Sequence, residues 1–211
     1  MYKWIERNLP WILLAVLIGI SAAFWLTTVD MANLSAYRIF PILGLLAWEM
    51  MWVQCVVMMT TILGLRHSKN KHFKDFSEWS ILPLIILHPG ILAIQSFIDS
   101  GQLPPDSYLS YVGPDNAWAI VLGVLGLVIF LSYDLFKLLR KALRRRNMYK
   151  YVSVLQAIGM VAIFVHGLAI GSLMNTGFGY VWIVLGVVLV PCLTLYIMHE
   201  FRRSKTSPVA H

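Results

Sequence analysis

Six long apolar runs, joined by short polar segments, make up most of this 211-residue chain. An α-helix rises about 1.5 Å per residue, so roughly 20 apolar residues cross the ~30 Å hydrocarbon core of a bilayer. A water-soluble domain of this size cannot bury so much apolar surface, since 59% of the residues are hydrophobic and 13% are charged. The sequence therefore predicts an all-α membrane protein, a six-transmembrane-helix bundle that forms one domain over residues 1–211. The predicted helices are residues 10–29, 40–65, 80–98, 117–138, 151–173 and 180–198.

The basic residues predict how this bundle is oriented. Of the 17 Lys and Arg residues, only Arg38 falls in the first, third or fifth connection or at its edge. Positively charged loops stay on the cytoplasmic side, so both termini are predicted to be cytoplasmic in a multi-pass protein of the plasma or inner membrane. The net charge of +7 and the Arg144-Arg145-Arg146 cluster are read as topology signals that also meet anionic lipid headgroups. Membrane lipid is thus an expected partner and nucleic acid is not.

Two of the six histidines lie inside apolar runs, His88 before Pro89-Gly90 and His166 before Gly167. A membrane histidine without a partner leaves ring nitrogens unsatisfied at a cost of several kcal/mol. The third and fifth runs both lead outward from the cytoplasm, so the two rings reach similar depths, near the midplane or slightly outside it. The adjacent glycines leave room for a flat macrocycle. These features favour axial ligation of the iron of one b-type haem by both histidines, with hydrogen-bonded structural histidines as the alternative.

With these residues in place, the chain resembles the ferric-reductase-like transmembrane domain family. That family includes NADPH oxidase cores, the six-transmembrane epithelial antigen metalloreductases and the haem-binding membrane subunit of the bacterial periplasmic methionine sulfoxide reductase. Its pattern is six helices with cytoplasmic termini and haem-binding histidines on the third and fifth. Many members carry Trp-x-x-Leu-His thirteen residues before the second histidine of helix five. Here Tyr149-Lys150-Tyr151-Val152-Ser153 stands thirteen residues before His166.

The departures from the family pattern concern the inner, cytoplasmic half. Ser153 replaces the inner histidine of helix five, and Lys74 stands fourteen residues before His88, where two-haem members carry their other inner ligand. A hydroxyl and a protonated amine are poor haem ligands, so one haem per chain is expected. Ser153 and Gln156, with Lys74 and Lys150 nearby, are a candidate slot for the ring and phosphate of a flavin, FMN or FAD. A purely structural inner half is the alternative.

Glu49 lies within the second apolar run, near the predicted depth of the histidines. A carboxyl there is expected to be protonated or paired. It can accept a hydrogen bond from a haem-ligating histidine and so orient the ring. A structural contact and a proton-carrying group are equally open interpretations.

No catalytic residue is predicted, because the sequence has no Gly-x-Gly-x-x-Gly fingerprint and no recognisable nucleophile or triad. Two functions remain. In the first, the chain is the membrane component of an oxidoreductase and passes electrons from a cytoplasmic reduced flavin or flavin reductase to an outer-side redox partner, ferric iron or a quinone. In the second, it is a non-redox transporter or scaffold, whose histidines and Glu49 line a polar path. A helical bundle by itself does not decide between them.

Overall fold

A computed structural model describes residues 2–29, 32, 35–65, 70–143 and 149–205 of the chain, and almost all of these are helical. Six helices are long and apolar enough to cross a membrane. This confirms the predicted all-α, six-helix membrane architecture. The six are α1 (Tyr2–Thr28), α2 (Ala36–Ile62), α3 (Lys71–Ser100), α5 (Ala117–Leu143), α6 (Tyr149–Ile170) and α7 (Phe178–Lys205).

The helix ends differ from the predicted ends because hydropathy marks the part of a helix that lies in hydrocarbon, not the part that is hydrogen-bonded. Helix α3 begins at Lys71, well before residue 80, and continues to Gly101, whose φ of +70° ends it. The connection that follows lies between two predicted helices, at residues 99–116. It contains a short helix, α4 (Asp106–Val112), and a 3-10 turn, η2 (Pro114–Asn116).

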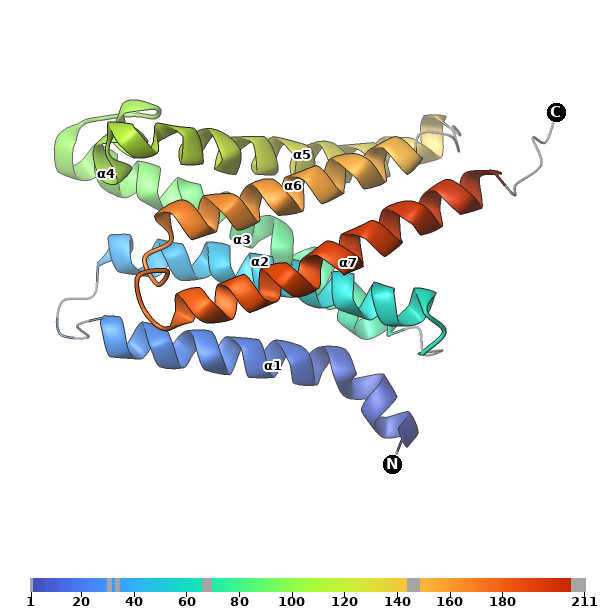
Figure 1. Ribbon diagram of the computed structural model, residues 1–211. Coiled ribbons are helices and arrows are strands. Elements are labelled where there is room, and N and C mark those ends of the chain that lie inside the picture. The colour runs from blue at the N-terminus through green and yellow to red at the C-terminus, as the bar shows by residue number, and fades with distance from the viewer. Residues whose placement is uncertain (1, 30–31, 33–34, 66–69, 144–148, 206–211) are drawn as a thin grey trace.

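The helices pack as two hairpins joined by α7 (Figure 1). Helix α2 packs along α3, and α5 packs along α6, while α7 packs on both α2 and α6. Helix α4 contacts α3 and α5 at the end of the bundle away from the chain termini, which share the opposite end. We call the end with α4 the outer end and the end with the termini the inner end, after the distribution of basic residues.

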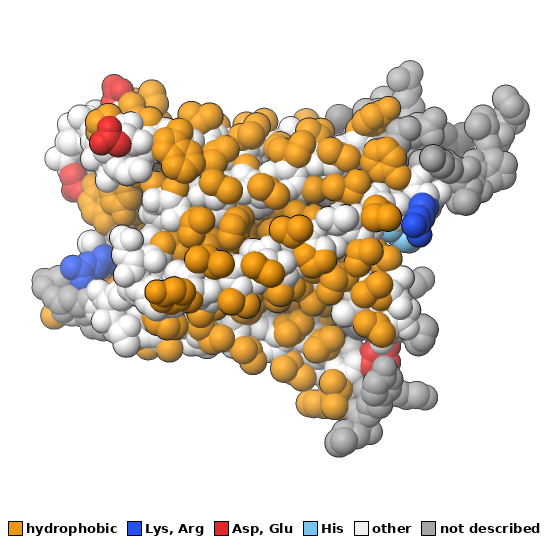
Figure 2. Space-filling model, in the orientation of Figure 1, with side chains coloured by type: hydrophobic (Ala, Val, Ile, Leu, Met, Phe, Trp, Pro, Cys, Tyr) orange, Lys and Arg blue, Asp and Glu red, His pale blue; other side chains and the backbone are white. Residues whose placement is uncertain are grey.

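The flanks of the bundle are apolar, as a lipid-facing surface requires. Hydrophobic side chains cover the face seen in Figure 2, and the charged side chains gather at its two ends. Exposed apolar residues include Val121, Val128, Ile183 and Val187. Helix α2 is the most buried of the six spans and supplies much of the core. This places the second helix at the centre of the molecule.

Candidate functional site

His88 and His166 line one cavity between the hairpins. His88 comes from α3 and His166 from α6, and Tyr108 and Tyr111 of α4 line the same cavity from the outer end. The centre of a water molecule can occupy about 200 Å³ of this cavity. One water needs only about 10–15 Å³ by this measure, so the cavity has room for a much larger ligand. Most of the other lining side chains are apolar.

The spacing of the two imidazoles suits one shared metal ion. Their ring centres are 6.4 Å apart and their planes are 86° from parallel. An imidazole nitrogen binds a metal at roughly 2 Å, and the ring centre lies about 1 Å behind that nitrogen, so rings sharing one ion have centres about 6 Å apart. The observed separation agrees with this value.

Both rings are held by backbone carbonyls. Nδ1 of His88 is 2.7 Å from the carbonyl oxygen of Phe40, and Nδ1 of His166 is 2.7 Å from that of Ala119. A carbonyl oxygen only accepts, so Nδ1 carries the proton in each ring and donates it. In a neutral imidazole the lone pair then lies on Nε2, the nitrogen available to a metal. Within the described part of the chain, neither Nε2 has a hydrogen-bond partner.

The carbonyls place the site near the outer end of the bundle. Phe40 lies in the first turns of α2, and Ala119 lies in the first turn of α5. Both helices begin at the outer end, next to α4. The pair therefore lies closer to the outer end of the bundle than to the inner end.

Gly167, which the sequence singled out, lines the cavity, but the glycines that lie against the rings are two that the sequence did not single out. A Cβ added at Gly90 would meet nothing within 4 Å, and one at Gly167 would meet Trp182. The glycines that face the imidazoles are Gly44 of α2 and Gly123 of α5. These lie on the neighbouring helices, so only the register between helices reveals them.

Glu49 contacts α1 and not the histidines. Its side chain is fully buried, and it accepts a hydrogen bond from the hydroxyl of Ser21. Its other oxygen, Oε2, has no partner among the described residues. Because carbonyls already accept from both imidazoles, the Ser21 contact fits the structural interpretation of this carboxyl.

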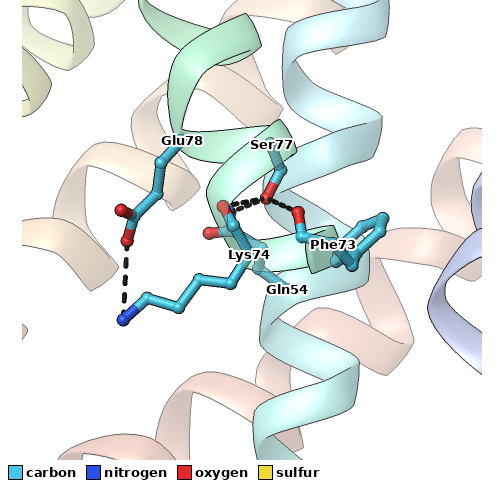
Figure 3. A network of polar contacts seen from close by, with 5 residues as sticks. All are labelled: Gln54, Phe73, Lys74, Ser77 and Glu78. Atoms are coloured by element: carbon cyan, nitrogen blue, oxygen red, sulfur yellow. Dashed lines mark hydrogen bonds and ion pairs between the residues drawn. The ribbon is translucent and has the colours of Figure 1, made fainter. Parts of the chain in front are cut away.

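Three of the four residues predicted to form a flavin slot at the inner end do not line the histidine cavity: Ser153, Gln156 and Lys74. Ser153 is 3% exposed and donates to the hydroxyl of Tyr196 at 3.1 Å, and that hydroxyl donates to Gln156 at 3.1 Å. Lys74 forms an exposed ion pair of 3.7 Å with Glu78, one turn along α3 (Figure 3). Ser153 and Gln156 thus share a partner, whereas Lys74 stands apart from them.

A second polar cluster near the inner end links α2 to α3. Gln54 of α2 donates to the hydroxyl of Ser77, which in turn donates to the carbonyl of Phe73 (Figure 3). The side chain of Lys150, the fourth residue of the predicted slot, lies outside the described residues.

Within the described residues, no three His, Cys, Asp or Glu side chains gather as a metal site. A metal ion in the cavity would therefore have the two imidazoles as protein ligands and need its other ligands from a cofactor. The cavity, the ring separation and the fixed tautomers suit a haem iron with two axial histidines. Comparisons with known proteins find no matching family model, no matching curated protein and no matching solved structure.

Proposed function

We propose that this protein is a membrane electron-transfer component that binds one b-type haem between His88 and His166. The observation that carries the proposal is the pair of imidazoles lining one largely apolar cavity, with ring centres 6.4 Å apart and each Nδ1 bonded to a carbonyl. The ferric-reductase-like resemblance rests on the same two residues and supports the same chemistry.

In this function the protein positions the iron ligands and excludes water. The carbonyls of Phe40 and Ala119 hold the ring orientations and make the imidazoles more basic, as is usual for the partners of metal-bound histidines. With His88 and His166 both holding a haem, the site would favour electron transfer over binding of a small molecule. When bound, the haem supplies one-electron chemistry.

The charge distribution supports a transfer from the inner end to the outer end. The basic inner end is the docking side for a cytoplasmic reduced flavin or flavoprotein, and the histidine pair lies close to the outer end, where an acceptor collects the electron.

Ser153 and Gln156 already bond Tyr196, so a flavin ring bound there displaces that tyrosine. Haem reduction by added reduced FMN tests the slot. A reduction rate that saturates with FMN concentration and is lowered by Ser153→Trp supports the slot. A rate that does not saturate and is unchanged in Ser153→Trp refutes it.

The transporter interpretation lacks a comparable observation. In the described part of the bundle, the buried polar side chains form separate groups, such as Ser21 with Glu49 and Ser153 with Tyr196. No contact links either group to the histidines. A non-redox role therefore becomes the conclusion only if the purified protein fails to bind haem.

An optical spectrum of the purified protein separates the two functions. A b-type haem with two axial histidines gives a Soret band and, after reduction, sharp α and β bands. The proposal predicts these bands in protein expressed with an adequate haem supply. Their absence, in protein that elutes as a single folded species, would refute the haem function.

A further inference from the structure

Each imidazole meets a glycine on the neighbouring helix, at a distance that leaves no room for a side chain. A Cβ at Gly44 would lie 2.8 Å from Nδ1 and 2.9 Å from Cε1 of His88. A Cβ at Gly123 would lie 2.7 Å from the same two atoms of His166. Real Cβ atoms essentially never approach other heavy atoms closer than 3.0 Å. Alanine at either position therefore forces the ring or the helix to move.

The glycine and the carbonyl belong to the same helical turn. In an α-helix the carbonyl of residue i accepts from the amide of residue i+4. Phe40 and Gly44 have this relation in α2, and Ala119 and Gly123 have it in α5. A carbonyl oxygen has two lone pairs, so an imidazole can add as a second donor if nothing projects from position i+4. The missing Cβ lets the ring reach that carbonyl.

The same arrangement occurs in both hairpins and not at the other glycines of the spans. A Cβ at Gly19 or Gly90 would meet nothing within 4 Å, and one at Gly126 or Gly159 would meet apolar side chains. The two rings that share the cavity are also the two that lie against glycines. Tight glycine contacts also occur elsewhere in the bundle, as at Gly186 against Phe164, but among the described glycines only Gly44 and Gly123 meet an imidazole.

We propose that Gly44 and Gly123 are positioning residues, each of which seats one histidine on the carbonyl four residues before it. This seating fixes the proton on Nδ1, leaves Nε2 free for a metal and sets the angle between the two rings. Neither glycine touches the ligand through this contact; each acts through its histidine. The inference deepens the proposed function, and its haem readout rests on that function.

The first test uses the haem-free protein and does not depend on the cofactor. The ¹⁵N chemical shifts of the histidines report which ring nitrogen carries the proton. Wild-type protein is expected to have His88 and His166 in the Nδ1–H form, and Gly44→Ala is expected to change that state for His88 alone. Gly123→Ala is expected to do the same for His166 alone. Variants that keep the wild-type shifts at both histidines would overturn the proposal.

The second test separates a clash with the ring from general damage to the fold. Gly44→Ala is expected to lower the melting temperature of the haem-free wild type but not that of His88→Ala, in which the clashing ring is gone. Gly90→Ala, two residues from His88 in a helix with open space, is the matched control and should lower neither. If Gly44→Ala is equally destabilising with and without His88, the positioning role is refuted.

The third test measures the loaded protein. Each alanine variant at position 44 or 123 is expected to retain several-fold less haem, or to hold it with a shifted midpoint potential, while Gly90→Ala matches wild type. Alanine variants with wild-type haem content and potential would contradict the proposal. Wild-type protein that binds no haem would instead refute the proposed function, and the tautomer and stability tests would still decide the role of the glycines.

Discussion

The outer and inner halves of the bundle satisfy their buried polar groups in different ways. In the outer half, backbone carbonyls accept from one nitrogen of each histidine, and the second nitrogen has no partner among the described residues. In the inner half, Ser153, Tyr196 and Gln156 bond to one another. The second imidazole nitrogens of the outer half are therefore available to a ligand, whereas the three side chains of the inner cluster bond to one another.

The hydrogen bonds of the inner half connect side chains of two different helices. The hydroxyl of Ser153 bonds to Tyr196 of α7, which also bonds to Gln156. The side chains of this inner cluster thus bond to one another across α6 and α7.

The largest effect is expected from removing an outer ligand. His88→Ala or His166→Ala should abolish haem retention, because a single imidazole cannot supply both axial bonds. Absorbance of the purified variants at the Soret band measures this loss. His72→Ala and His199→Ala, which change histidines towards the inner end, should bind as wild type does. If His88→Ala or His166→Ala kept the spectrum of a haem with two histidine ligands, the outer pair would not be the haem site.

The stoichiometry should be one haem per chain. Ser153 and Lys74 offer no axial ligand in the inner half, so only the outer pair is competent. A pyridine haemochrome assay against protein concentration measures the ratio. A value near two would mean that the inner half also holds a haem and that His72 or His199 is a ligand.

Haem should stabilise the fold by joining the two hairpins. In the described structure, α2 and α3 pack together, as do α5 and α6, while the two pairs connect mainly through α7 and α4. A ligand at 100 times its dissociation constant stabilises the folded state by about 2.7 kcal/mol. Thermal unfolding of loaded and haem-free protein measures the gain. His88→Ala should lose it, and a gain that survives this change would place the ligand elsewhere.

The smallest effect is expected from the inner cluster. Tyr196→Phe removes the hydroxyl that bonds Ser153 and Gln156 and should cost about 1 kcal/mol of stability, a typical value for a buried hydrogen bond. The haem spectrum and potential should not change. A loss of haem from this variant would mean that the inner half supports the site directly.

Much of the architecture was predictable because each membrane helix can be recognised from the length of its own apolar run. His88 and His166 stood out for the same reason, since few ionisable side chains lie at that depth. Their hydrogen-bond partners did not stand out. Glu49 was a candidate partner, yet the carbonyls of Phe40 and Ala119 hold the rings. Every helix has carbonyls, and only the register between helices determines which carbonyl a histidine contacts.

The glycines illustrate the same limit. Gly90 and Gly167 are close to the histidines in sequence, but Gly44 and Gly123 are the glycines that lie against the rings. Hydropathy also missed α4, whose seven residues are too short and too polar to register as a span. Contacts between helices far apart in the chain decide these features, and a single sequence does not encode them in any local pattern.

The central claim is that one haem iron lies between His88 and His166 in the outer half. Electron paramagnetic resonance of the oxidised, purified protein tests it most directly, because the signal of a low-spin ferric haem depends on the angle between its two imidazole planes. Ring planes 86° apart predict a single, strongly anisotropic low-spin signal that is absent from His88→Ala and His166→Ala. A high-spin signal, or a low-spin signal that either variant retains, would contradict the account.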